Sequence, residues 1–405
     1  MVRSTMPLRD GHQLQLLEGA REFYPALIEA VSRARTRIQL ETYILDFTGS
    51  TQAVLEALMD AARRGVRVQM AVDGVGTGVL PADWAQRFQD AGLECRVFVP
   101  LGTLGLLIPS RWRRLHRKLA VVDGQLAFCG GINLLDDHHD PYHGALQAPR
   151  LDYAVRVTGP LVGDMQDTMN QLWLRMEAAQ RLRQRQLTGA MQSFRALRSV
   201  PETGVAAAGE GPIHHARAGL LLRDNLRNRL VIEQAYRRAI GMARREIIIA
   251  NAYFLPGYKL RKALVTAAQR GVRVQLLLQG RYEYFMQYYA SRPVYAQLMQ
   301  AGVEIHEYAA SFLHAKVAVI DGHWATVGSS NLDPLSLLLA REANVVVDDR
   351  DFAMRLRERL LQVIAREGQR IEAAAFASRS LAQRVRERLA LGLMRLALFL
   401  TGKRY

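Results

Sequence analysis

An internal duplication constrains the fold of this chain more than any other feature of its sequence. Residues 61–74, AARRGVRVQMAVDG, return as residues 267–280, AAQRGVRVQLLLQG. Residues 115–133, LHRKLAVVDGQLAFCGGIN, return without a gap as residues 313–331, LHAKVAVIDGHWATVGSSN. Repeats of this length indicate two structurally similar halves. With 405 residues, 49% of them hydrophobic, the chain can bury a core in each half.

Each half shows the same order of predicted elements, with helix and strand alternating three times before a β-hairpin. Apolar strands that alternate with helices predict an α/β fold with a mainly parallel sheet and helices on both faces. The Asp-Gly pairs at 123–124 and 321–322 predict tight hairpin turns. We expect a first half over residues 1–180, a linker over 181–218, a second half over 219–370 and a basic amphipathic helix over 371–405.

Both hairpins carry a histidine and a lysine at the start of an apolar strand. The shared motif reads H-x-K-x4-D-x6-G-[GS]-x-N, and its functional candidates are His116, Lys118, Asp123, Asn133, His314, Lys316, Asp321 and Asn331. Side chains alternate along a strand, so the histidine and the lysine of each copy share one face. One such pair is typical of a solvated strand edge, but its recurrence in matched surroundings indicates a function.

These residue types suit the chemistry of phosphodiesters. One imidazole can attack phosphorus, while the other, with an unperturbed pKa near 6.5, protonates the leaving alkoxide and later deprotonates the incoming hydroxyl. The lysines and asparagines of both copies are assigned to phosphate binding, so that neither a metal nor a cofactor is required. Asp123 and Asp321 are weaker catalytic candidates, because an Asp-Gly turn also explains them structurally.

Two acidic residues are candidates for orienting the histidines. Residues 151–157, LDYAVRV, align with residues 341–347, REANVVV, which matches Asp152 with Glu342 at the start of an apolar strand. A catalytic imidazole needs an acceptor at its second ring nitrogen. We expect Asp152 to orient His116 and Glu342 to orient His314, each within its own half. An ordinary acidic residue at a strand edge is the alternative.

Composition and charge narrow the range of partners and locations. The net charge of +16 and the pI of about 10.3 favour an anionic partner, either nucleic acid or an acidic phospholipid surface. Two cysteines exclude a disulfide framework and a cysteine-based zinc site. The first residues lack the apolar core of a signal peptide, and no apolar run approaches the roughly 20 residues that span a bilayer. A soluble or peripheral protein on the cytoplasmic side is therefore expected.

Two stretches are candidates for contact with a membrane surface. Residues 99–114, VPLGTLGLLIPSRWRR, belong to an insertion that the second half lacks, and residues 380–405 combine arginines with an apolar series. Apolar and aromatic residues beside arginines suit the boundary between lipid and water. The candidates are Leu106, Leu107, Trp112, Leu396 and Phe399. A loop packed over the core and a helix docked on the domain or at a dimer contact are the alternatives. The histidine-rich residues 136–144 are interpreted as a polar rim, with no metal.

The duplicated motif resembles that of the phospholipase D superfamily, and the resemblance extends over most of the chain. The stretches IQLETYILDFTG and GSSNLDPLSLLLAREANVVV are similar to bacterial cardiolipin synthases, most of all to the short type called cardiolipin synthase B. The resemblance implies a duplicated α/β/α sandwich with one active site at the interface of the two halves. It also implies a phosphohistidine intermediate on one of the two motif histidines.

On this resemblance we expect transfer of a phosphatidyl group from one phosphatidylglycerol to another, with release of glycerol. His116 is assigned as the nucleophile and His314 as the general acid, and the reverse assignment stays open. The expected partners are phosphatidylglycerol, other anionic phospholipids and the cytoplasmic face of the bacterial inner membrane, without nucleic acid. Phospholipid hydrolysis, a nuclease activity and an inactive membrane-binding scaffold are the alternatives. The oligomeric state is not predicted.

Overall fold

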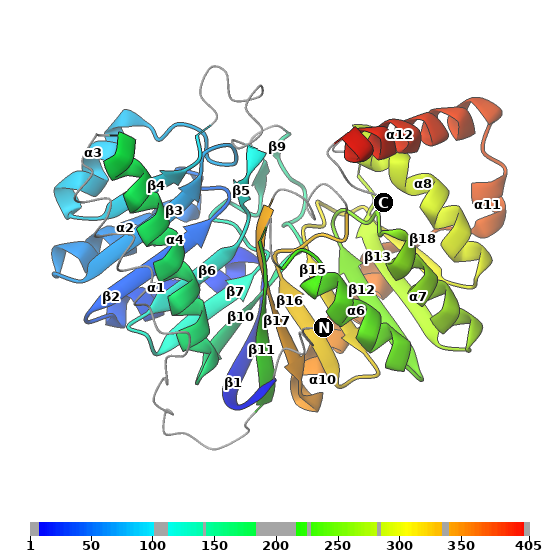
Figure 1. The fold of residues 1–405 in the computed structure, drawn as a ribbon, viewed down its shortest axis with the longest axis horizontal. Coiled ribbons are helices and arrows are strands. Elements are labelled where there is room, and N and C mark those ends of the chain that lie inside the picture. Colours follow the sequence, from blue (N-terminus) through cyan, green and yellow to red (C-terminus); the bar gives the residue numbers. More distant parts are fainter. Residues whose placement is uncertain are drawn as a thin grey trace.

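One large mixed sheet joins the two halves of the molecule. The computed structural model describes residues 8–100, 112–140, 143–183, 216–224, 228–281, 285–333 and 340–400 of the chain. Within these residues the sheet runs in the order β18-β14-β13-β12-β15-β16-β17-β11-β1-β10-β7-β6-β2-β3-β4 (Figure 1). At its centre β1 (Arg9–Glu18) pairs antiparallel with β11 (Ala216–Arg223), so the halves share one continuous sheet.

The elements follow the duplicated order of the sequence. The first half continues with α1 (Gly19–Arg33), β2 (Arg37–Thr42), α2 (Thr51–Arg63), β3 (Arg67–Asp73), α3 (Ala82–Ala91), β4 (Glu94–Phe98), β5 (Arg114–Leu115), β6 (Lys118–Val122), β7 (Leu126–Gly130), β8 (His139–Asp140), β9 (Gly144–Ala145), β10 (Tyr153–Thr158) and α4 (Leu161–Arg183). The second half continues with α6 (Val231–Met242), β12 (Glu246–Asn251), α7 (Tyr258–Gln269), β13 (Arg273–Gln279), α8 (Phe285–Gln300), β14 (Glu304–Tyr308), β15 (Lys316–Ile320), β16 (Trp324–Gly328), β17 (Ala340–Asp348), α10 (Arg350–Glu367), β18 (Gly368–Arg370), α11 (Ala373–Ala377) and α12 (Leu381–Leu400). Most of the expected linker lies outside the described residues.

The expectation of a mainly parallel sheet is wrong. Parallel pairing joins β2 to β3, β3 to β4, β12 to β13, β13 to β14 and, between the halves, β5 to β17. The other pairs of the large sheet are antiparallel. The helical crossovers α2, α3, α7 and α8 return the chain in its original direction, whereas the direct hairpins β6–β7 and β15–β16 reverse it.

Helices pack on apolar side chains of both faces of the sheet. In β6, Ala120 and Val122 pack in the core of α1, α2 and α3, whereas Leu119 and Val121 face the core of α4. The latter core also contains side chains of α10 and of β15, β16 and β17, so it spans both halves. Truncation of a fully buried member such as Leu356 to alanine would cost about 2–5 kcal/mol. This shared core fixes the two hairpins relative to each other.

The C-terminal helix α12 packs on the second half with one face only. Ala390, Leu391 and Met394 are buried in the core that also holds α6, α7 and α8. The opposite side exposes apolar side chains three or four residues apart, here called the α12 stripe, which consists of Leu381, Val385, Leu389, Leu393 and Leu396. Among the described helices, none has the length and apolar character needed to cross a bilayer.

Candidate active site

The two His–Lys pairs lie at the start of equivalent hairpin strands. His116 and Lys118 stand at the beginning of β6, and His314 and Lys316 stand at the beginning of β15. Lys118 is 5% exposed and Lys316 is fully buried, so neither ammonium group is a solvated surface charge. The Lys118 Nζ donates to the carbonyl of His116 at 2.8 Å, and the Lys316 Nζ donates to the carbonyl of His314. Each lysine is therefore held beside its histidine.

Each histidine is held by the half to which it does not belong. The Nδ1 of His116 lies 3.0 Å from the Oε2 of Glu342, and the Nδ1 of His314 lies 2.6 Å from the Oδ2 of Asp152. The main chain also joins the two halves here, because the N–H of His116 donates to the carbonyl of Arg341, the residue before Glu342, at 3.1 Å. Likewise, the N–H of His314 donates to the carbonyl preceding Asp152 at 2.9 Å. The histidines of both halves therefore meet in one composite site.

This exchange corrects the expected pairing of each acid with the histidine of its own half. The residues ahead of the acids pair across the interface, since β5 runs beside the start of β17 and Leu151 bridges to Leu313. The two acids occupy equivalent positions in the repeat, so an alignment finds both of them. It cannot distinguish a partner in the same half from one in the other half, because the two candidates look the same in sequence.

Burial dominates the electrostatics of the site. It lowers the pKa of His116 and, with the charges of the two lysines, lowers the pKa of His314 well below its ordinary value. Burial also lowers the pKa of Lys118 to about 7 and raises that of Asp152 to about 7. Burial opposes ionisation of Glu342, but the charge of His116 and their hydrogen bond hold the pKa of Glu342 below its usual value. Glu342 therefore favours its ionised form at the hydrogen bond to His116.

The two asparagines follow the second strands of the hairpins. Asn133 comes after β7 and Asn331 after β16, and both are nearly buried. The Oδ1 of Asn133 accepts a hydrogen bond from the N–H of Ile44 at 3.1 Å, which leaves its side-chain amide hydrogens to donate. A buried amide donor of this kind suits the stabilisation of a phosphate oxygen.

Asp123 and Asp321 lie at the turns of the hairpins, at the strand ends away from the histidines. Asp123 and Gly124 have φ values of 51° and 68°, as a type I′ turn requires, and Asp321 and Gly322 repeat the conformation. The Asp123 carboxylate accepts hydrogen bonds from main-chain N–H groups of residues 35–37 at 2.8–2.9 Å, and Asp321 does the same at residues 244–246. Their assignment as catalytic residues is therefore replaced by a structural one.

The variable position of the motif supports the two acids in different ways. The Ser329 Oγ donates to the Oε2 of Glu342 at 2.6 Å. Gly131 occupies the matching position in the first half, where an added Cβ would come within 2.2 Å of the Asp152 Oδ1. The difference between serine and glycine at this position is visible in the motif as G-[GS]. The sequence alone gives no reason to connect this difference with Glu342 and Asp152.

Two further residues lie beside the histidine, lysine and acid of the candidate site. The ring centroid of Tyr43 is 4.8 Å from that of His116, and the Lys118 Nζ is 5.3 Å from the Tyr43 centroid. Arg223, which is 2% exposed, is paired in register with Glu342 and contributes to the low pKa of that carboxyl. Tyr43 matches Tyr253 in the repeat and could have been noticed, whereas the position of Arg223 depends on the pairing of β11 with β17.

The membrane-contact candidates are only partly described. Leu106 and Leu107 lie outside the described residues, as does the side chain of Phe399. Trp112 is half-buried and Leu396 is 54% exposed. In the histidine-rich segment, the described part contains a hydrogen-bond contact of 2.9 Å between the His143 Nδ1 and the Asp140 Oδ1. Within the described ranges, no group of three or more His, Cys, Asp or Glu residues is arranged to hold a metal ion.

Comparison with known proteins gives consistent matches over most of the chain. The family described as "Cardiolipin synthase, PLD-like domain" matches residues 27–144 and 236–364. Cardiolipin synthase B of Escherichia coli K12 is 37% identical over 374 residues, which cover 90% of this chain and 83% of that protein. Cardiolipin synthase B of Salmonella typhi is 38% identical over 382 residues, with 92% and 85% covered. Cardiolipin synthase A of Cronobacter sakazakii is 30% identical, with 94% and 74% covered.

Solved structures share the fold at low sequence identity. Phosphatidylserine synthase of Haemophilus influenzae Rd KW20 superposes with a TM-score of 0.70 at 15% identity, covering 97% of this chain and 96% of that chain. Polyphosphate kinase of Porphyromonas gingivalis superposes with a TM-score of 0.55 at 15% identity, covering 89% of this chain and 49% of that chain. The two-half architecture is thus common to these proteins.

Proposed function

The chain belongs to the cardiolipin synthase family with phospholipase D-like domains, and on that basis we propose that it joins two phosphatidylglycerol molecules into cardiolipin. It would be a phosphatidyltransferase that releases one glycerol for each cardiolipin formed. The observation that carries the proposal is the composite site, in which two histidines, each beside a buried lysine, are tied to carboxylates of the opposite halves. Such a site can form and break a phosphoester without a metal.

We assign the nucleophile to His116 and the general acid to His314. The Nε2 of His116 attacks phosphorus, the bond to the glycerol oxygen breaks, and His314 passes to that oxygen a proton that it shares with Asp152, whose pKa of about 7 lets the pair hold one proton near neutral pH. In the second step His314 takes the proton of an incoming hydroxyl, whose oxygen bonds to phosphorus as the bond to His116 breaks. The hydrogen bond to ionised Glu342 supports this assignment, because it stabilises the positive charge that His116 gains during attack.

The buried cations offset the negative charge of the phosphodiester. Lys118 and Lys316 stand beside the two imidazoles, and the amide of Asn133 has donors to spare. In a site that excludes water, fixed donors stabilise the non-bridging oxygens more strongly than solvent does. Exclusion of water also favours a lipid hydroxyl over hydrolysis as the acceptor of the phosphatidyl group.

The α12 stripe is proposed as the contact with an anionic membrane. Its exposed apolar side chains are accompanied by the exposed arginines Arg384, Arg386, Arg388 and Arg395, and the net charge of the chain is +16. Apolar residues that insert at headgroup depth and arginines that meet acidic lipids reinforce each other. We propose peripheral association with the cytoplasmic face of the inner membrane, where phosphatidylglycerol would be both substrate and docking surface.

Product analysis tests the proposed function. Purified protein is incubated with phosphatidylglycerol vesicles, and the products are quantified by mass spectrometry. Cardiolipin and glycerol are expected in equal amounts, and His116→Ala abolishes both, whereas the exposed control His323→Ala leaves them unchanged. Phosphatidic acid as the sole lipid product would favour the hydrolase alternative and overturn the synthase assignment.

A further inference from the structure

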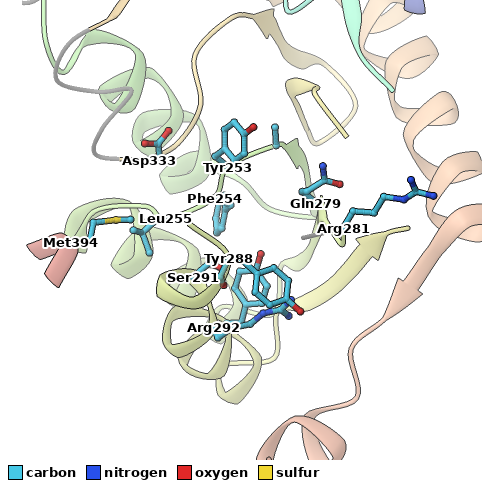
Figure 2. A pocket seen from close by; sticks show the side chains of 12 residues that line it. Tyr253, Phe254, Leu255, Gln279, Arg281, Tyr288, Ser291, Arg292, Asp333 and Met394 are labelled. Atoms are coloured by element: carbon cyan, nitrogen blue, oxygen red, sulfur yellow. The ribbon is translucent and has the colours of Figure 1, made fainter. Parts of the chain in front are cut away.

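A pocket in the second half lies between the catalytic residues and α12. It is open to solvent and is lined by residues of β13, α8 and α12 and of the segments after β12, β13 and β16. Figure 2 shows Gln279 and Arg281 on one side, Leu255 and Met394 on the opposite side, and Tyr253 between them.

Residues that line this pocket form hydrogen bonds with the second copy of the motif. The Oε1 of Gln279 accepts the N–H just before His314 at 3.2 Å, and the N–H of Ala252 donates to the carbonyl just after His314 at 3.0 Å. The N–H of Leu255 donates to the carbonyl of the residue after Asn331 at 2.9 Å. A ligand in the pocket would therefore sit beside the catalytic residues of the second half.

The first half provides an internal comparison for Gln279. The repeat matches it with Asp73, whose Oδ2 accepts the N–H of Leu115 and whose Oδ1 accepts the N–H of Val75, at 2.7 and 2.8 Å. Gln279 keeps the first of these roles but adds an amide nitrogen. That Nε2 is buried and makes no hydrogen bond to any described residue. A buried donor without a partner costs free energy, so its retention points to a ligand acceptor.

Arg281 adds positive charge at the same side of the pocket. The repeat matches it with Val75, which is uncharged. The Nε and Nη2 of Arg281 donate at 3.1 Å to the carbonyls of Ala309 and Ala310, which fixes the guanidinium. No carboxylate of the described chain lies within ion-pair distance of it, so its charge is available to an anion. The second half thus carries donors and a cation where the first half has an acid and a valine.

We infer that this pocket binds the headgroup of the accepting phospholipid, a polyol phosphodiester, which deepens and rests on the proposed function. Gln279 and Tyr253 face its hydroxyls, Arg281 attracts its phosphate, and the side formed by Leu255 and Met394 leads its glycerolipid part toward α12. In the transfer step the terminal hydroxyl oxygen bonds to the phosphorus held on His116. The bond from phosphorus to nitrogen breaks, and the hydroxyl proton passes to His314. The asymmetry of the halves thereby separates donor from acceptor.

Partitioning of the covalent intermediate between two acceptors tests this inference. The full chain is incubated with phosphatidylglycerol vesicles in dilute ethanol, and cardiolipin, phosphatidylethanol and released glycerol are measured together. Ethanol is too small to need the pocket, so glycerol release reports formation of the intermediate alone. In Arg281→Met and in Gln279→Glu, which keeps the acceptor before His314, the ratio of cardiolipin to phosphatidylethanol falls by about tenfold or more. Phosphatidylethanol formation falls less than cardiolipin formation, because ethanol does not need the pocket.

The control and the contrary outcomes are defined by the same assay. Arg238→Met removes one exposed positive charge from α6, outside the pocket, and keeps the parental ratio. An unchanged ratio in both pocket variants, or an equal fall of cardiolipin and phosphatidylethanol, overturns the acceptor pocket. Failure of the proposed function would look different, because the parent protein would then make no cardiolipin at all.

Discussion

The substitution Gly131→Ala tests the crossed arrangement without touching a catalytic group. Gly131 does not have a positive φ, so alanine fits its backbone. Its new Cβ would lie 2.2 Å from the Asp152 Oδ1 and 2.6 Å from the Oδ2. Contacts below 3.0 Å do not persist, so the carboxylate must move by about 0.8 Å. Asp152 is buried and holds His314 at 2.6 Å, so the displacement acts on the histidine of the other half.

The expected loss follows from that displacement. A misplacement of nearly 1 Å in a catalytic group costs roughly 100-fold in kcat, or about 2.7 kcal/mol of transition-state stabilisation. The assay is cardiolipin formation under saturating phosphatidylglycerol, with thermal unfolding measured in parallel. Gly241→Ala is the matched control, because its Cβ meets no atom within 4 Å. Parental activity of Gly131→Ala would refute the role of Asp152 in holding His314.

Three further changes separate the catalytic, electrostatic and membrane parts of the account. Glu342→Gln lowers kcat by roughly 10²–10⁴-fold, because His116 loses its ionised partner, and NMR of the imidazole nitrogens detects the change at His116. Lys118→Met abolishes most activity but raises the free energy of unfolding at pH 7, because it removes a buried ammonium; equilibrium denaturation measures this. Replacement of both Leu389 and Leu393 by serine weakens binding to anionic vesicles more than tenfold in a sedimentation assay, since each buried leucine contributes about 1.5–3 kcal/mol.

Their controls sharpen these expectations. The pKa of Lys118 is about 7 in the folded protein and higher in the unfolded chain, so the parent gains stability relative to Lys118→Met as the pH rises above 7. A difference that does not change with pH would contradict the burial of its charge. For Glu342→Gln, a change of the NMR signals confined to His314 would indicate that Glu342 pairs with the histidine of its own half. For the membrane variants, Leu230→Ser is the control, because Leu230 is 49% exposed and lies away from α12.

Sequence repetition alone was sufficient to find most of the site. The two copies of the motif identified both histidines, lysines and asparagines, and their alignment identified Asp152 and Glu342. The family resemblance is confirmed by the relatives that the chain matches. These features are visible because the same residue types recur at fixed spacings in each copy. The roles assigned to the residues stay predictions that the variants above test.

Features that depend on contacts between the halves could not be read in the same way. The sequence of β17 is compatible with a partner in either half, so the exchange of Asp152 and Glu342 required the pairing of β5 with β17. The antiparallel pairing of the hairpins with β2 and β12, and of β1 with β10 and β11, was likewise hidden by the alternation of helices and strands. The unpaired Nε2 of Gln279 can be recognised only from the structure, which shows that the Oε1 of the same amide accepts the N–H before His314. Tertiary register, rather than local propensity, decides each of these points.

The most direct test of the central claim counts the active sites and locates the intermediate. His314→Ala is mixed with a phosphatidyl ester of p-nitrophenol, a leaving group that needs no proton, so that the first step proceeds while the second lacks its base. We predict a burst of one p-nitrophenolate for each chain, with the phosphatidyl group on His116 after peptide mapping. A burst of two for each chain, labelling at another residue, or no burst would contradict a single composite site built around His116.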